Sequence, residues 1–322
     1  MRAFITGASG FIGTHLVNDL LQRGWEVRVI LHKHGTPFTG RLEAVTGDLA
    51  DLPSLTKSMK DTDVVFHLAS ALGSSLIPEK EFQTINAAGT ESVLKAAAEV
   101  GVKTVIHFSS AGVLGHVPEN RPVDESYPTN PLDAYDRSKL EGEQIALGYG
   151  HKGLDVRVIR PGWVYGPGDK RTLKLIRAVA RRRILMVSSG LTLQSPVFID
   201  DLVEGTFRCL EKGRKAEVYH LAGPETLSIK TMIATIARAA GKRPPRMRLP
   251  LGPAKAAAWF LDKVYRPFKK EAPLTPSRLA FFLRAKPLDI SKAVRELGYA
   301  PRMSFVEGIK VTLAWYRENG WL

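Results

Sequence analysis

Apolar positions follow two rhythms through the first 160 residues. Short apolar runs predict buried strands, and longer stretches with apolar residues every three or four positions predict amphipathic helices. The predicted strands are Arg2–Thr6, Glu26–Leu31, Leu42–Thr46, Asp63–Leu68, Thr104–Ser109 and Asp155–Arg160. The predicted helices are Phe11–Arg23, Leu52–Met59, Phe82–Val100 and Ala134–Leu147. This alternation predicts an α/β fold with a Rossmann-type, doubly wound parallel sheet, whose ligands bind beyond the carboxyl ends of the strands.

After Pro161 strands and helices no longer alternate regularly, and most of the predicted elements are helices. The predicted helices there are Arg171–Arg183, Asp200–Lys212, Ile229–Ala240, Pro253–Val264, Pro276–Leu283 and Phe305–Asn319, and the predicted strands are Val197–Ile199 and Val218–Leu221. We therefore expect a nucleotide-binding domain over residues 1–165 and a smaller, mostly helical substrate-binding lobe over 166–322. The two interleave, because segments near 197–222 are expected to return to the main sheet.

Three glycines follow the first strand at a spacing of three: Gly7, Gly10 and Gly13. The first allows a tight turn, the second lets a pyrophosphate approach the backbone, and the third lets the helix pack close to the strand. The helix N-terminus then offers free N–H groups and a positive dipole end. A glycine-rich turn without a ligand is the alternative, but the flanking strand and helix favour a dinucleotide site.

Positive charge is concentrated at the C-terminal end. The 322 residues carry a net charge of +14, and residues 241–322, with 17 basic and six acidic side chains, account for +11 of it. Beside these charges lies Ala254–Val264, an apolar stretch with Trp259 and Phe260. It predicts either peripheral contact with an anionic membrane or, more commonly, a solvated basic face beside a core-facing helix. No nucleic-acid-binding motif accompanies the charge.

The single cysteine, Cys209, excludes an internal disulfide and a cysteine zinc cluster, and no metal site is expected. No apolar run approaches the ~20 residues that span a bilayer. The first strand begins at Arg2, so no signal peptide is expected before it. These observations predict a cytoplasmic protein, with membrane association at most at the surface.

Ser110, Tyr135 and Lys139 are candidates for proton-transfer chemistry. Tyr135 and Lys139 lie four residues apart on one predicted helix, where an ammonium would lower the pKa of the phenol and could also bind a cofactor ribose. Ser110 follows a predicted strand and so faces the ligand edge of the sheet. Taken separately, Tyr135 and Lys139 would be a surface pair, and Ser110 would be part of a turn at the end of a strand. Taken together, the three residues predict hydride transfer with tyrosine as the general acid or base.

These motifs resemble the extended short-chain dehydrogenase/reductases, the NAD-dependent epimerase/dehydratase superfamily, along nearly the whole chain. The matching segments are Thr6–Gly13, Gly47–Leu49, His67–Ser70, Asn86–Thr90, Arg160–Gly168 and Phe198–Asp201. The resemblance implies that Tyr135 is the general acid/base, Lys139 its partner and Ser110 the group that polarises the substrate oxygen. Homodimerisation through Phe82–Val100 and Ala134–Leu147 is implied by analogy alone.

The resemblance also implies a set of cofactor-contacting residues. They are Gly7, Ser9, Gly10, Phe11, Ile12, Gly13, His32, Lys33, Asp48, Leu49, Leu68, Ala69, Ser70, Asn86, Ser109, Tyr135, Lys139, Pro161, Gly162 and Val164. The second strand ends in Leu31, where an acid would bind the ribose hydroxyls of NAD and repel a 2′-phosphate. Lys33 and His32 favour NADP as the cofactor. NAD remains the alternative if Lys33 is only a solvated loop residue.

Two departures count against a nucleotide-sugar substrate. Trp163 replaces the asparagine, and Gln194 the diphosphate-binding arginine, that sugar-nucleotide enzymes of the family usually carry. The segments around Ala111-Gly112 and Tyr135 resemble the hydroxysteroid dehydrogenase and dihydroflavonol reductase branch instead. Leu72, Gly112 and Trp163 are the expected substrate-pocket residues. Leu114, Trp259 and Phe281-Phe282 suit an apolar substrate or, as is commoner for such residues, are simply core.

Three functions stay open at this point. The first is an NAD(P)(H)-dependent oxidoreductase that interconverts a hydroxyl and a keto group on a sterol-, flavonoid- or lipid-like substrate. The second is a nucleotide-sugar epimerase or dehydratase with tightly bound NAD. The third is a non-catalytic, dinucleotide-dependent sensor, against which the intact Ser110, Tyr135 and Lys139 set argues.

Overall fold

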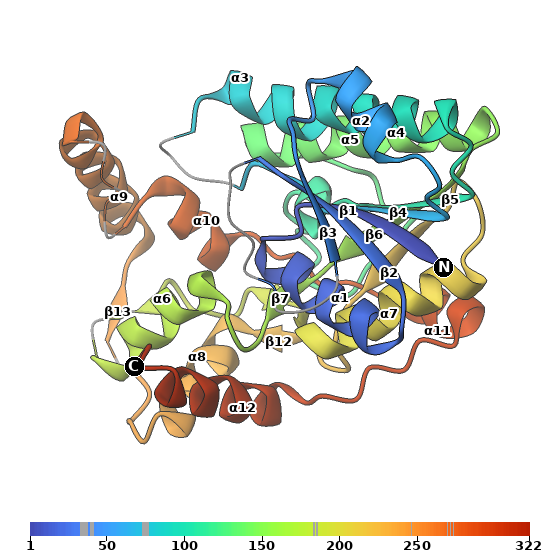
Figure 1. Cartoon of the computed structure of the whole chain (residues 1–322). Coiled ribbons are helices and arrows are strands. Elements are labelled where there is room, and N and C mark those ends of the chain that lie inside the picture. The colour runs from blue at the N-terminus through green and yellow to red at the C-terminus, as the bar shows by residue number, and fades with distance from the viewer. Residues whose placement is uncertain are drawn as a thin grey trace.

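A seven-stranded parallel sheet forms the centre of the protein (Figure 1). The computed structural model describes every residue except 33–37, 39–41, 73–76, 183, 185, 246, 269, 271 and 273. The strand order is β11-β6-β5-β4-β1-β2-β3, so the order reverses between β1 and β4. The strands are β1 Arg2–Thr6, β2 Glu26–Leu31, β3 Leu42–Thr46, β4 Val64–His67, β5 Thr104–Phe108, β6 Asp155–Pro161 and β11 Val218–Leu221. This topology confirms the predicted Rossmann-type sheet.

Helices cover both faces of the sheet, as its two-sided apolar strands require. In β1, Ala3 and Ile5 belong to one hydrophobic core and Phe4 belongs to the other. The helices on the first side are α1 Phe11–Gln22, α7 Ile199–Lys212 and α11 Ser291–Leu297; those on the second are α2 Leu52–Ser58, α4 Gly89–Glu99 and α5 Ala134–His151. Figure 1 shows these two layers above and below the sheet.

Three details differ from the sequence prediction. The helix predicted over Phe82–Val100 begins earlier, with α3 Glu79–Phe82, and its next turns are a π-helix, Gln83–Ala88, before α4. The strand predicted at Val197–Ile199 is β10, Pro196–Phe198, because Ile199 already starts α7. Helix α11 was not predicted.

The chain beyond Pro161 builds a second region while returning to the sheet. From the range expected to return to the main sheet, β11 pairs with β6, whereas β10 lies in a separate two-stranded sheet. The remaining helices are α6 Lys170–Ala180, α8 Ile229–Ala239, α9 Leu251–Tyr265, α10 Pro276–Leu283 and α12 Phe305–Glu318. Three small sheets join them: β7 Trp163–Tyr165 with β10, β8 Met186–Val187 with β13 Arg248–Leu249, and β9 Leu193–Gln194 with β12 Leu227–Ser228.

Helix α9 stands away from the rest of the protein (Figure 1). It continues into a 3₁₀ turn, Arg266–Phe268, before the chain comes back to α10. Within the described part of the chain, no helix combines the length and apolar character needed to cross a bilayer.

Candidate active site

One large cavity opens at the carboxyl ends of the central strands. Its volume is about 1790 Å³, well above the roughly 300–1,000 Å³ of a single small-molecule site. The glycine turn lines one part of the cavity, and Trp163, Phe281 and Phe282 line another. The cavity therefore has room for a dinucleotide and a substrate together.

The glycine turn is as tight as its spacing predicted. Gly7 has a φ of +73°, and a Cβ there would lie 2.6 Å from the backbone nitrogen of Ala69 at the end of β4. A Cβ on Gly13 would lie 2.2 Å from the carbonyl oxygen of Gly7. Side chains at these two positions would separate α1 from β1 and β4. The glycines therefore bring the start of α1 close to the cavity.

The residues present fit a dinucleotide. The first turn of α1 has no side-chain cap and no acidic residue, so its N–H groups and dipole remain available to a phosphate. Ser109 Oγ lines the cavity and, among the described residues, is buried without a hydrogen-bond partner. A buried polar atom of this kind is normally satisfied, which a bound ligand would do here.

Nearly all predicted cofactor residues line this cavity. These are Gly7, Ser9, Gly10, Phe11, Ile12, Gly13, His32, Asp48, Leu49, Leu68, Ala69, Ser70, Ser109, Tyr135, Lys139, Pro161, Gly162 and Val164. Ser110 and the predicted substrate residues Leu72, Gly112 and Trp163 line it as well. Lys33 lies outside the described residues.

Asn86 is the exception, and its prediction as a cofactor contact needs correction. Its side chain is fully buried behind the cavity wall. The amide oxygen accepts from Ala71 N at 2.7 Å and Ser70 Oγ at 3.0 Å, and the amide nitrogen donates to Ala71 O and Ser138 Oγ. Asn86 thus positions the Ser70–Ala71 wall segment, with its bonding capacity already used.

The end of β2 lacks the acid that selects NAD. Leu31 is buried there. The next residue, His32, is exposed at the cavity edge, with its Nδ1 3.3 Å from Asp48 Oδ2. The carboxyl end of β2 thus carries no carboxylate among the described residues to repel a 2′-phosphate, although Asp48 lies next to His32.

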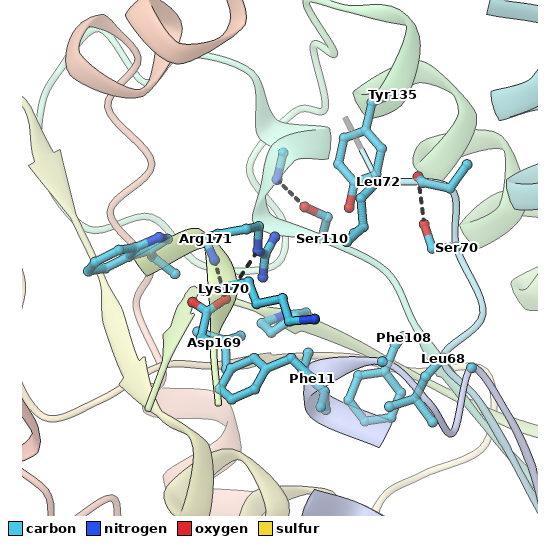
Figure 2. Close-up of a pocket in the computed structure, with 18 of the residues that line it drawn as sticks. Phe11, Leu68, Ser70, Leu72, Phe108, Ser110, Tyr135, Asp169, Lys170 and Arg171 are labelled. Carbon is cyan, nitrogen blue, oxygen red and sulfur yellow. Dashed lines mark hydrogen bonds and ion pairs between the residues drawn. The ribbon is translucent and has the colours of Figure 1, made fainter. Parts of the chain in front are cut away.

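The hydroxyls of Ser110 and Tyr135 point toward each other in the cavity (Figure 2). Ser110 Oγ accepts a hydrogen bond from Gly112 N at 2.9 Å, at the start of the 3₁₀ turn Ala111–Leu114. Tyr135 is in the first turn of α5, whose N-cap is Asp133. Two separate elements, the end of β5 and the start of α5, thus bring the hydroxyls together.

Burial raises the pKa of Tyr135 above its ordinary value. The positive charge of Arg171 and the hydroxyls of Ser110 and Ser70 oppose this rise without cancelling it. Lys139, which was predicted to lower the pKa of the phenol, instead donates from its Nζ to Phe108 O at 2.6 Å. The predicted lowering of the pKa of the phenol was therefore wrong: burial raises this pKa, and Tyr135 is a neutral phenol at neutral pH.

Lys139 is itself a buried cation. Burial lowers its pKa to about 8, against the effect of the Glu143 carboxylate. Glu143, one turn further along α5, forms a buried two-point ion pair with Arg160 of β6, with N–O distances of 2.9 and 2.5 Å. A charged lysine at neutral pH thus lies beside this buried pair.

Aromatic rings build the substrate part of the cavity. Trp163 stacks on Tyr165 with ring centroids 5.8 Å apart, and its ring lies 5.5 Å from that of Phe281. Leu114 is fully buried and Trp259 is exposed, and neither lines the cavity. The expectation that those two residues suit a substrate was wrong, while Trp163 and Phe281-Phe282 do line the cavity.

Gln194, which stands where related sugar-nucleotide enzymes usually carry an arginine, binds backbone carbonyls near the end of α10. Its amide nitrogen donates to Arg284 O at 2.7 Å and to Phe281 O at 3.4 Å. The side chain therefore holds the end of α10, the helix that carries Phe281 and Phe282 into the cavity. Because glutamine is uncharged, Gln194 supplies no positive charge for a diphosphate.

Charged residues near the hydroxyls of Ser110 and Tyr135 were missed from the sequence. Arg171, at the start of α6, extends into the cavity on the side of Ser110 and pairs with Asp169 at 3.7 Å (Figure 2). On another wall, buried Asp136 lies 3.6 Å from both Arg284 and Lys286. Burial raises the pKa of Asp136 to about 6, and these two cations oppose the rise. The position of Asp136 directly after Tyr135 was the feature of the sequence that could have identified it as part of the site.

A Rossmann-type sheet, a glycine turn at its switch point and a serine–tyrosine–lysine set in one cavity define a dinucleotide-dependent oxidoreductase. The sequence model of the NAD dependent epimerase/dehydratase family matches residues 3–222. The chain belongs to this family of extended short-chain dehydrogenase/reductases and is an enzyme.

Relatives carry both kinds of chemistry that the sequence left open. The chain is 31% identical over 320 residues to a 4-hydroxy-2-methyl-3-oxo-4-farnesyl-3,4-dihydroquinoline-1-oxide ketoreductase of Stigmatella aurantiaca, covering 96% of this chain and 95% of the relative. It is 29% identical to 3beta-hydroxysteroid-dehydrogenase/decarboxylase isoform 1 of Arabidopsis thaliana, covering 96% and 78%. A solved dTDP-glucose 4,6-dehydratase from Streptomyces venezuelae, with NAD bound, matches with a TM-score of 0.80 and 28% identity, covering 100% and 98%.

Proposed function

We propose that this enzyme reduces a keto group on a largely apolar substrate with NADPH. The observation that carries the proposal is the meeting of the Ser110 and Tyr135 hydroxyls in a cavity that has the glycine turn in one part and aromatic rings in another. The reverse reaction, oxidation of the corresponding alcohol, uses the same groups.

The protein's contribution to the reaction is to hold and protonate the substrate oxygen. Ser110 Oγ accepts from Gly112 N, and its hydroxyl hydrogen can turn from Tyr135 toward that oxygen. Tyr135 is a neutral phenol at neutral pH because its pKa is raised, and it donates the proton that the oxygen needs. The bound nicotinamide supplies or takes the hydride. Lys139 remains the predicted partner of Tyr135, because this charged residue lines the same cavity one helical turn further along α5.

An apolar substrate fits the rest of the cavity. Trp163 and Phe281 present ring surface to it, and Gln194 is engaged with backbone carbonyls. Two relatives are named for a farnesylated quinoline ketone and for a hydroxysteroid. These names support a sterol- or prenyl-like carbonyl compound as the substrate class.

NADP is the cofactor we propose in preference to NAD. Leu31 leaves the end of β2 without the acid that would repel a 2′-phosphate, and exposed His32 offers a partner for it. The family as a whole is NAD dependent, and the matching dehydratase structure contains NAD. Calorimetric titration with NADPH and NADH tests the preference, and tighter binding of NADH would reject it.

Nucleotide-sugar conversion with retained NAD is the second candidate. Arg171 favours it, because a guanidinium in the cavity would attract the diphosphate of such a substrate. It predicts NAD in the purified protein and calorimetric binding of dTDP-glucose. The proposed ketoreductase predicts neither result.

The direct test compares Tyr135→Phe with the wild type. NADPH consumption is followed with 5α-cholestan-3-one as a trial ketone, and NADPH binding is measured by calorimetry. We expect Tyr135→Phe to abolish turnover while it binds NADPH like the wild type. Tyr127→Phe is the matched control, since that hydroxyl bonds to Glu119 at the surface. Full turnover in Tyr135→Phe would reject the mechanism.

A further inference from the structure

Helix α9 presents its apolar side chains to solvent. Only Ala254 and Ala258, one turn apart, are buried against the body of the protein. Trp259, Phe260 and Val264 on the outward side are 57%, 60% and 42% exposed, and Phe268 just beyond the helix is 71% exposed. Large side chains therefore point outward and small ones inward, the reverse of an ordinary surface helix. The large apolar side chains of α9 therefore face solvent, and its two buried alanines face the core.

The exposed face is also positively charged. Lys263 Nζ lies 4.1 Å from the centroid of the Trp259 ring on the same side of the helix, and Lys255 is exposed one turn before Trp259. The helix has one acidic residue, Asp262, against these two lysines. Aromatic rings with flanking cations match the interfacial region of an anionic bilayer, where rings enter the headgroup level and cations meet lipid phosphates.

The base of α9 joins the wall of the active-site cavity. Ala254 and Ala258 pack in one cluster with Leu279 of α10. The same helix α10 carries Phe281 and Phe282 into the cavity. A surface that binds the outward side of α9 would therefore lie next to the aromatic end of the cavity.

We propose that Trp259, Phe260, Val264 and Phe268, with Lys255 and Lys263, form a docking face for an anionic lipid surface. A second copy of this chain fits the face less well. A two-fold contact through it would bring the same lysines together, within a C-terminal region whose charge is +11. Docking itself does not depend on the proposed function; only its role in delivering an apolar substrate rests on it.

The test is co-sedimentation of the full chain with lipid vesicles. One set is phosphatidylcholine, and the other contains phosphatidylcholine and phosphatidylglycerol in roughly a three-to-one ratio. We expect binding to the anionic vesicles that weakens with added salt. Lys255→Gln/Lys263→Gln should lower this partition by roughly fivefold for each lysine removed. Trp259→Ser/Phe260→Ser should lower it in both low and high salt.

Two controls make the outcome decisive. Leu191→Ser removes an equally exposed apolar residue, 58% exposed in the β8–β9 connection, and should bind vesicles like the wild type. NADPH-dependent turnover of a water-soluble ketone should be the same in both α9 variants, so failure of docking and failure of the proposed function can be told apart. Equal vesicle binding by all variants would reject the docking face. So would an α9 variant that dissociates a dimer in sedimentation equilibrium, because a second copy would then be the occupant.

Discussion

The buried ion pair between Glu143 and Arg160 offers a quantitative test of how the site is built. Arg160 Nε and Nη2 donate to the two carboxylate oxygens of Glu143 at 2.9 and 2.5 Å, and the two side chains are 5% and 2% exposed. Arg160 Nη1 has no further partner among the described residues. The Arg160 charge therefore depends on Glu143, which also acts on the buried Lys139. Charges ~4 Å apart attract by about 4 kcal/mol at an effective dielectric constant near 20.

Removing one partner should cost much more than replacing both. Glu143→Leu leaves the guanidinium buried without a counter-charge, and we expect it to lower the free energy of unfolding by about 3–5 kcal/mol. Arg160→Met leaves the carboxylate in the same position and should cost a similar amount. In the double variant both charges and their desolvation cost are gone. The double variant should therefore lose less free energy of unfolding than either single variant.

Urea unfolding of the four proteins measures this double-mutant cycle, with free energies from linear extrapolation. The expected coupling energy is about 3 kcal/mol or more. Single losses below about 1 kcal/mol, or losses that simply add, would refute the claim that the pair is buried and mutually dependent. Calorimetry with NADPH on the same proteins shows whether each variant keeps a native cofactor site.

Two further predictions follow from single positions around the site. Gly112→Ala should lower the free energy of urea unfolding by about 1–3 kcal/mol, because its Cβ would lie 1.9 Å from Asp136 Oδ1. Gly148→Ala is the control: a Cβ at this helix position would meet nothing within 4 Å, and the variant should raise the free energy of unfolding by about 0.5–1 kcal/mol. Equal effects of the two substitutions would reject the argument. The pKa of Lys139 is lowered to about 8 in the folded protein. Between pH ~8 and ~10.5 the unfolded chain therefore binds one more proton than the folded protein, and the contribution of this lysine to stability rises with pH. Lys139→Met should remove a rise of about 3 kcal/mol in the free energy of unfolding across that range, and identical pH profiles for the variant and the wild type would contradict the burial of the lysine charge.

The nucleotide-binding half could be predicted because its determinants are local. Strand β1 and helix α1 follow from the apolar run and the amphipathic stretch on either side of Gly7–Gly13, and both lie where predicted. The parallel sheet follows from the alternation, since a helix between strands returns the chain in the same direction. Short elements were harder. Helix α11 has seven residues, and its signals were Asp289, which accepts from Ser291 N, and Gly298 with a φ of +67°.

The state of the site could not be predicted, because it depends on contacts between distant segments. Asn86 lies in a matching motif, yet the Ser70–Ala71 segment uses its amide from behind the cavity wall. Gln194 was noted only as a missing arginine, and its bonds to the end of α10 join residues about 90 positions apart. Neither partner can be read from sequence spacing.

Tyr135 shows most clearly how a correct pattern can lead to a wrong direction for a pKa shift. A four-residue spacing placed Lys139 on the same face of α5, but its Nζ donates a hydrogen bond to the carbonyl oxygen of Phe108, and burial dominates the pKa of the phenol. A neutral phenol and a serine hydroxyl can both donate a hydrogen bond. Two donors match an oxygen that only accepts, which is a carbonyl rather than an alcohol. This arrangement supports the reductive direction that we propose, because oxidation would first require the Tyr135 proton to be removed.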